Sequence, residues 1–141
     1  MKEKITGSEA LMRSKTSSDE AYMAINKRTV GAEYEDMAAE YLKKQGFRII
    51  ERNFSCRTGE IDIIAEEKGC ICFVEVKYRT RKGQGSPLEA VTGLKQRKIS
   101  RTAAYWLLKN RKPEDTACRF DVVGIEPEGI TLIRNAFDYR Y

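Results

Sequence analysis

Three charged residues, Asp62, Glu75 and Lys77, interrupt the apolar stretch GEIDIIAEEKGCICFVEVKYRT, residues 59–80. Charges inside buried strands are costly unless something pairs with them. Carboxylates, lysines and a bound cation are also the groups on which hydrolytic chemistry must rest in a chain without histidine. We therefore ask first how the chain would place these three side chains.

The two apolar runs predict a β-hairpin with its turn at Lys68 and Gly69. An even-length turn centred between these residues places Asp62 opposite Glu75 and Glu60 opposite Lys77. An odd-length turn would slide charges onto the apolar face of the hairpin, so the pattern disfavours it.

Two carboxylates facing each other are destabilising unless a cation lies between them. Mg²⁺ prefers such oxygen ligands. Lys77 lies on the same face as Glu75, about 7 Å along the strand, in reach of a metal-bound water or a substrate phosphate. The alternative is a solvated strand face on which Asp62 pairs diagonally with Lys77. From the residues alone, both interpretations stay open.

The composition narrows the chemistry. The chain has 141 residues, a net charge of +5 and no histidine. The absence of histidine excludes a Ser-His-Asp triad, a Cys-His pair and a zinc site that uses imidazole. The cysteines, which are Cys56, Cys70, Cys72 and Cys118, include no C-x-x-C motif and read as reduced thiols. A four-cysteine zinc site within a structural module is the alternative.

Cations dominate residues 77–112, where Glu89 is the only acid. Such an excess suits a phosphate backbone, although a solvated helix face would look the same. No window approaches the ~18 consecutive apolar residues of a membrane span. The N-terminal stretch also lacks the apolar region of a secretory signal, so we expect a cytoplasmic protein without membrane contact.

The periodicity predicts one α/β domain with a mixed sheet flanked by helices, in the order α-β-β-β-α-β-β. Residues 1–28 read as a disordered or loosely helical arm, and residues 29–141 as the folded domain. The expected helices begin at Val30 and Pro87 and end at Gly46 and Leu108, with Leu94 on the buried side of the second. The expected strands are 47–54, 60–67, 70–79, 118–126 and 129–137.

At these motifs the chain resembles the YraN-like family of small bacterial proteins. That family belongs with the restriction-endonuclease-like PD-(D/E)xK nucleases, among which it is most similar to archaeal Holliday-junction resolvases. The resemblance runs from about Gly31 to Phe137. It rests on GAEYEDMAAEYL, RNFSCRTGEIDIIA, FVEVKYR, GSPLEAV, RFDVV and NAF in this order. Ile61 departs from the proline common in the superfamily, and the N-terminal arm has no counterpart.

The resemblance implies roles for single residues. Asp62 and Glu75, with the carbonyl of Val76, would hold Mg²⁺, and Lys77 would position or activate the attacking water. Glu35 matches the glutamate of the family's first helix, where it would complete the metal site or hold Lys77.

Two further residues match the family. Lys95 would contact phosphate, and Asp121 reads as structural, paired with Arg119 or Arg79.

We therefore expect a metal-dependent endonuclease that uses Mg²⁺, or Mn²⁺ in its place. It would act on branched or structured DNA rather than RNA, and as a homodimer if it cuts a four-way junction symmetrically. The residues expected to grip the backbone are Arg79, Arg81, Lys82, Lys95, Lys98 and Arg101. The alternatives are a catalytically silent nucleic-acid-binding adaptor and a nuclease acting on RNA.

Overall fold

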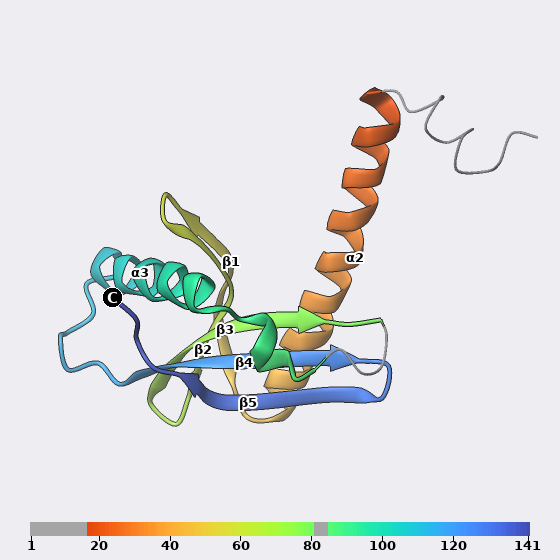
Figure 1. The fold of residues 1–141 in the computed structure, drawn as a ribbon. Helices are drawn as coiled ribbons and strands as arrows, with labels where there is room; N and C mark the ends of the chain where they lie inside the picture. Colours follow the sequence, from red (N-terminus) through yellow and green to blue (C-terminus); the bar gives the residue numbers. More distant parts are fainter. Residues whose placement is uncertain (1–16, 81–84) are drawn as a thin grey trace, which may run out of the picture. The chain divides into compact units, whose positions relative to one another are not determined.

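The computed structural model describes residues 17–80 and 85–141. Their elements follow the predicted order α-β-β-β-α-β-β, with a mixed sheet (Figure 1). The elements are α2 (Ser17–Lys44), β1 (Arg48–Cys56), β2 (Gly59–Glu67), β3 (Cys70–Tyr78), the 3₁₀ turn η1 (Pro87–Ala90), α3 (Gly93–Lys109), β4 (Cys118–Glu126) and β5 (Gly129–Phe137). The expected strands 118–126 and 129–137 agree with β4 and β5 at both ends.

The five strands form one sheet in the order β1-β2-β3-β4-β5. All neighbouring pairs are antiparallel except β3 and β4, which run parallel. A parallel pair needs a crossover connection, and η1 with α3 supplies it. The crossover carries the chain from Lys77 on β3 onto one face of the sheet before it returns in β4.

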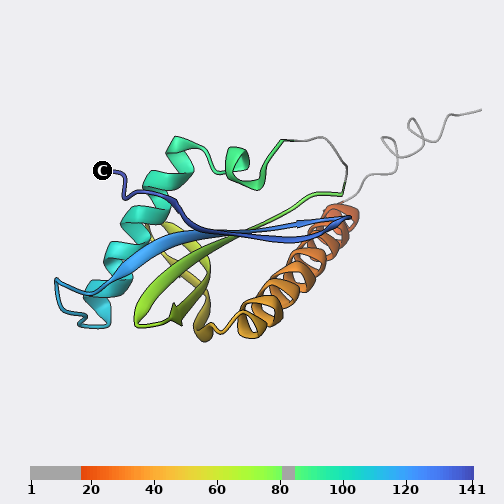
Figure 2. The same ribbon diagram turned by 90° about the horizontal axis from the view of Figure 1, so that it is seen from below.

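Both faces of the sheet are buried, so the core has two halves. Figure 2 shows α3 on one side of the sheet and the last turns of α2 on the other. The half under α2 contains Ala38, Ala39, Leu42, Phe47, Ile63, Ala65, Cys72, Val74, Val76, Val123 and Ile125. The half under α3 contains Phe54, Ile61, Ile64, Ile71, Phe73, Val91, Ile99, Ala103, Trp106, Phe120 and Val122.

Helix α2 begins at Ser17, well before the expected start at Val30. The chain divides into two compact units whose boundary, between Glu33 and Tyr34, falls within this helix. The second unit, Tyr34–Tyr141, contains the sheet and α3 and is described from here on. Of the predicted arm, residues 1–16 lie outside the described residues. No helix in the described ranges has the length and apolar character needed to cross a bilayer.

The hairpin register agrees with the prediction wherever β2 and β3 pair, but the predicted pairs Asp62–Glu75 and Glu60–Lys77 lie beyond the last observed pair. The pairs of β2 and β3 run from Glu67 opposite Cys70 to Ile63 opposite Val74. Lys68 and Gly69 form the turn, with φ of 50° and 80°. Positive φ at both central residues is typical of a type I′ turn, which matches the twist of a two-residue hairpin.

The single long helix expected from Pro87 to Leu108 is wrong. The chain instead makes η1, leaves helical geometry at Val91 and starts α3 at Gly93. Thr92 has extended dihedrals, and its side chain accepts a hydrogen bond from the N–H of Lys95, so it acts as an N-cap. The new helix has a different phase, and Leu94, expected to be buried, is 58% exposed.

Candidate active site

Asp62 and Glu75 come together where the pairing of β2 with β3 ends. The last residue pair of the two strands is Ile63 with Val74, and Asp62 and Glu75 are the next residues beyond this pair on β2 and β3. At this point the side chain of Asp62 forms a hydrogen bond with the backbone of β3, because its Oδ2 accepts from the N–H of Val76 at 2.8 Å. The N–H and C=O of a strand residue point to the same neighbour, so the Val76 carbonyl points to the side of Asp62.

Glu75 is buried, with 5% of its surface exposed. Its Oε1 lies 3.4 Å from Nζ of Lys77 and 3.5 Å from Nζ of Lys95. A buried carboxylate is costly unless it is paired. The two ammonium groups supply that pairing, and they come from different elements, β3 and α3. The bend that separates η1 from α3 is therefore part of the site's construction.

Among the described residues no ammonium group forms an ion pair with Asp62, and its burial raises the pKa of its carboxyl to about 7. Burial is the largest cause, and the charges of Glu75 and Glu35 add to it. The hydrogen bond from Val76 and the charge of Lys95 act in the opposite direction. The site therefore has room for more positive charge beside Asp62, which a bound cation would supply.

Glu35, on α2, lies within electrostatic reach of Asp62. Burial raises the pKa of Glu35, while the charge of Arg52 and a side-chain hydrogen bond with Asn53 lower it. Arg52 also pairs with Asp36 at 2.8 Å. Glu35 thus interacts with Arg52 and Asn53 of β1, beside the site. Its role as a metal ligand or as a partner of Lys77 stays a prediction.

Strand β1 is distorted beside the site. Asn53, across from Asp62, has φ of 54°, in the left-handed region. The alternation of faces breaks at this point, because Ile61 belongs to the core half under α3 and Ile63 to the half under α2. Strand alternation would place Ile61 and Ile63 on one face, and the structure separates them. Asparagine adopts the left-handed region more readily than most residues, but its presence alone does not predict the distortion.

The donor set suits a hard divalent cation. Within residues 17–80 and 85–141, no three Asp, Glu or Cys side chains converge into a ready-made metal cage. Mg²⁺ does not need one, since it is usually bound by one or two carboxylates together with waters and substrate phosphates. Asp62, Glu75 and the carbonyl of Val76 fit that pattern. The alternative zinc site finds no support in the positions of the four cysteines, which are all described.

The predicted nucleic-acid-binding residues fall into different environments. Lys98 and Arg101 are exposed on α3, as a phosphate contact requires. Arg79 instead donates hydrogen bonds to the carbonyls of Gly85 and Ser86, at 2.8 Å for Ser86. It thereby ties the end of β3 to the start of η1. Arg81 and Lys82 lie outside the described residues.

A glycine on β4 decides how close η1 comes to the site. Gly124 pairs with Lys77 across the parallel ladder. A Cβ at Gly124 would lie 2.2 Å from Cγ of Pro87, so only glycine lets the Pro87 ring pack onto the strand. Gly124 was not among the residues predicted from the sequence. A glycine inside the apolar run DVVGIE is a usable signal of close approach.

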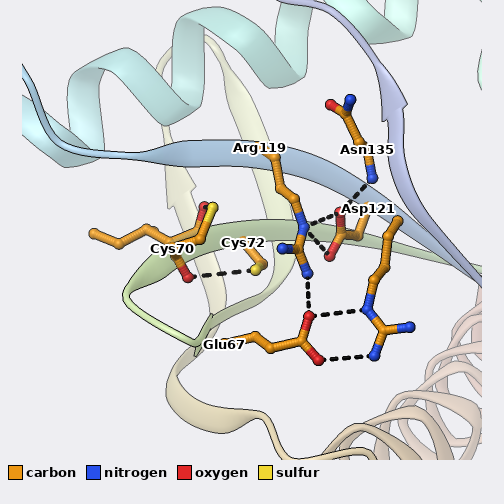
Figure 3. Close-up of polar contacts among 8 residues, drawn as sticks. Glu67, Cys70, Cys72, Arg119, Asp121 and Asn135 are labelled. Carbon is orange, nitrogen blue, oxygen red and sulfur yellow. Dashed lines mark hydrogen bonds and ion pairs between the residues drawn. The ribbon is translucent and has the colours of Figure 1, made fainter.

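A second polar cluster lies on β2, β4 and β5 and is shown in Figure 3. Arg134 donates to both oxygens of Glu67, at 2.9 and 2.7 Å, and Arg119 donates to Oε1 at 2.6 Å. Hydrogen bonds from Arg134 are the largest cause that lowers the pKa of Glu67, to about 2. Asp121 pairs with Arg119 at 2.9 Å and accepts from the N–H of Asn135, which confirms its predicted structural role.

Comparison with known proteins gives a consistent family. The model described as Uncharacterised protein family UPF0102 matches residues 34–125, which include the whole candidate site. A UPF0102 protein of Lachnoclostridium phytofermentans is 56% identical over 114 residues, 81% of this chain and 97% of that protein. One from Persephonella marina is 49% identical over 111 residues, 79% and 95% of the two chains. One from Geobacter metallireducens is 45% identical over 123 residues, 84% and 100%.

Proposed function

The chain belongs to protein family UPF0102, and from its carboxylate pair we propose that it is a metal-dependent endonuclease acting on branched or otherwise structured DNA. One observation carries the proposal. Asp62 and Glu75 lie just beyond the last residue pair of β2 and β3, where their charges interact, and two lysines approach Glu75 from different elements. The resemblance to the PD-(D/E)xK nucleases supports the same assignment.

Each residue of the site has a definite task in this proposal. Asp62, Glu75 and the carbonyl of Val76 would hold Mg²⁺, with Mn²⁺ as a substitute. The bound ion would polarise the scissile phosphate, lower the pKa of its bound water and neutralise developing charge. Lys77 positions the attacking water, and Lys95 contacts a phosphate oxygen.

The substrate assignment rests on charge and shape. Lys98 and Arg101 are exposed on the same helix that carries Lys95. Contacts of this kind position a backbone without reading bases, so recognition should follow the shape of the nucleic acid. The preference for branched DNA comes from kinship with the junction resolvases. Symmetric cutting of a four-way junction would need two copies of the chain.

A silent nucleic-acid-binding adaptor is the second candidate. It is favoured by the contacts of Glu75, because Lys77 and Lys95 already compensate its charge without a metal ion. In that case the basic side of α3 would bind DNA, and the carboxylate cluster would be structural.

Cleavage assays separate the two candidates. Wild type and Lys77→Ala are incubated with labelled duplex, flapped, single-stranded and four-way-junction DNA, and with the corresponding RNA, in Mg²⁺, Mn²⁺ or EDTA. Lys44→Ala, at the exposed end of α2, is the control for loss of a lysine. Cleavage that needs both metal and Lys77 supports the nuclease. Binding without cleavage under every condition supports the adaptor.

A further inference from the structure

A hollow of about 430 Å³ lies between the far end of α3 and the turn that joins β1 to β2. It is lined by Ser55, Cys56, Arg57 and Thr58 from the strand end and turn, and by Tyr105 and Lys109 from α3. The lining offers two cations, several hydroxyl groups and no acid. This set of groups suits an anion that accepts hydrogen bonds, such as a phosphate diester.

One edge of α3 joins this pocket to the candidate active site. Lys95, Lys98, Thr102, Tyr105 and Lys109 recur at helical spacing, so they lie along the same side of the helix. Lys95 reaches Glu75 at one end of this row. The rise of an α-helix places Tyr105 about 15 Å from Lys95, and Lys109 about 21 Å from it.

The β1–β2 turn is docked against the middle of the same edge. Oγ1 of Thr58 lies 2.9 Å from Oγ1 of Thr102, which donates to the carbonyl of Lys98 at 2.8 Å. A Cβ at Gly59 would lie 3.3 Å from Oγ1 of Thr102, which shows how closely the turn approaches. The pocket is therefore held by a hydrogen-bonded junction between two elements of the domain.

Tyr105 gives the pocket an aromatic wall. Its ring lies 6.2 Å from the ring of Phe54 with an angle of 23° between their planes, and Phe54 is buried. Nζ of Lys109 lies 5.5 Å from the centre of the Phe54 ring. Tyr105 nevertheless keeps 48% of its surface exposed. A ring that is fixed on one side and exposed on another is suited to stacking with an unpaired base.

We propose that this pocket binds an unpaired nucleotide of the nucleic-acid substrate, with its base on Tyr105 and its phosphate between Arg57 and Lys109. The proposal rests on the proposed function for its choice of nucleic acid, and it specifies the substrate further. At about 3.4 Å per step along a strand, the unpaired nucleotide lies about four to six steps from the scissile phosphate. The preferred substrate is then a duplex that carries a single-stranded arm at this distance.

Binding assays in EDTA test the proposal on two probes, a blunt labelled duplex and the same duplex with an arm of about six thymidines. Every protein carries Lys77→Ala, so that cleavage does not disturb the measurement. Tyr105→Ala should weaken binding of the armed duplex about five- to tenfold and leave the blunt duplex unchanged. Tyr105→Leu, which keeps the apolar contact with Phe54, should show the same loss. Equal affinities of wild type and Tyr105→Leu for the armed duplex would overturn the proposal.

The phosphate half of the site has a charge-matched control. The double variant Arg57→Gln/Lys109→Gln should reduce the slope of log affinity against log salt by up to about two for the armed duplex. The double variant Lys43→Gln/Lys44→Gln removes the same charge at the end of α2 and should keep the slope of wild type. Equal slopes in both double variants would remove Arg57 and Lys109 from the site.

Cys56 reports occupancy of the pocket directly. Burial acts to raise the pKa of this thiol, but hydrogen bonds from Thr58, Thr102 and the Gly59 backbone outweigh it and lower the pKa. The armed duplex should slow alkylation of Cys56 by N-ethylmaleimide. The exposed Cys118 is the control and should react at an unchanged rate. Mass spectrometry of one digest measures the alkylation of both cysteines. The blunt duplex and inorganic phosphate should not protect Cys56. Equal protection by inorganic phosphate would contradict a nucleotide site.

The two proposals fail in different ways. Arm-dependent affinity and protection of Cys56, in a protein that never cleaves, would keep the pocket and reject the nuclease. Cleavage that needs metal and Lys77, together with unchanged binding by the Tyr105 variants, would keep the nuclease and reject the pocket.

Discussion

The backbone N–H of Val76 donates a 2.8 Å hydrogen bond to Oδ2 of Asp62, just beyond the last residues at which β2 and β3 pair. A hydrogen bond from backbone to side chain thus links the two strands beyond their last backbone pair. This contact fixes one carboxylate oxygen of Asp62 beside the strand that carries Glu75. Burial and the charge of Glu75 raise the pKa of the Asp62 carboxyl to about 7. The first two predictions follow from this raised pKa.

Asp62→Asn should stabilise the protein above neutral pH. The pKa of Asp62 is raised by burial from 3.8 to about 7, so its ionisation in the folded state destabilises the fold. The stability present at low pH is lost as pH rises from about 4 through about 7, and the wild type should unfold more readily at pH 8 than at pH 5. Asparagine removes this loss, of which the part between pH 5 and pH 8 is on the order of 3 kcal/mol. Urea unfolding in EDTA at both pH values measures it.

The exposed Glu60, on the same strand, provides the control for this measurement. Glu60→Gln should keep the pH dependence of the wild type. If Asp62→Asn also keeps it, the carboxyl of Asp62 is not the group that titrates.

Binding of Mg²⁺ or Mn²⁺ should release a proton from Asp62. The ion favours the ionised carboxylate, and a group with a pKa of about 7 is half protonated at neutral pH. About half a proton should be released per bound ion at pH 7, and almost none at pH 9. Titration calorimetry in buffers of different ionisation enthalpy counts the protons. Proton release that survives in Asp62→Asn would locate the ion elsewhere.

Lys95→Ala should affect both binding and cleavage. Its ammonium lies 3.5 Å from Oε1 of Glu75, so the variant removes the proposed phosphate contact and half of the pairing of that carboxylate. The slope of log affinity for DNA against log salt should fall by about one. Fluorescence anisotropy over a series of salt concentrations gives the slope, with Lys44→Ala as control. A slope equal to that of the control would show that Lys95 serves Glu75 alone.

Glu67→Gln should destabilise the protein by about 1–3 kcal/mol at neutral pH, because Arg119 and Arg134 lose their shared partner. The pKa of Glu67 is lowered to about 2. Its stabilisation is therefore present above about pH 4 and is lost as pH falls through about 2. Denaturant unfolding at pH 7 and pH 3 measures this. Glu66→Gln, which removes an exposed partner of Arg48, should cost far less; equal losses would contradict the assignment.

Gly124→Ala should displace η1 from the sheet. The new Cβ would lie 2.2 Å from Cγ of Pro87, and relieving this overlap should cost about 1–3 kcal/mol. Because η1 leads into α3, the proposed cleavage should fall with the displacement of Lys95. Pro87→Gly removes the clashing ring, so in that background Gly124→Ala should cost little. A double-mutant cycle by thermal unfolding decides this, and a purely additive cycle would mean that the ring and the strand do not clash.

Much of the fold follows from local patterns. Alternating apolar residues predict all five strands, and the Lys68–Gly69 turn predicts the register of β2 with β3 up to the pair Ile63–Val74. These features depend on residues close together in the sequence. Local patterns of this kind cannot distinguish a metal site from a solvated strand face, so the residues alone leave both interpretations open.

The remaining features depend on contacts between distant segments. The apolar pattern continues from η1 into α3, so it conceals the break at Thr92, where side-chain capping competes with helix formation. A basic residue looks the same in the sequence whether it faces solvent or a carbonyl group, so the hydrogen bonds of Arg79 to Gly85 and Ser86 could not be predicted. The approach of Lys95 to Glu75 requires the crossover geometry, which no local pattern contains.

The two-residue turn at Lys68 and Gly69 also limits how the hairpin can change in evolution. If one residue is inserted and the turn keeps its two residues, every later side chain of β3 shifts to the opposite face and Glu75 leaves Asp62. An insertion that lengthens the turn to three residues preserves the pairs of β2 and β3 instead. A change of one residue in the interval between Asp62 and Glu75 should therefore be accompanied by a longer or shorter turn, whereas the two strands keep their pairs.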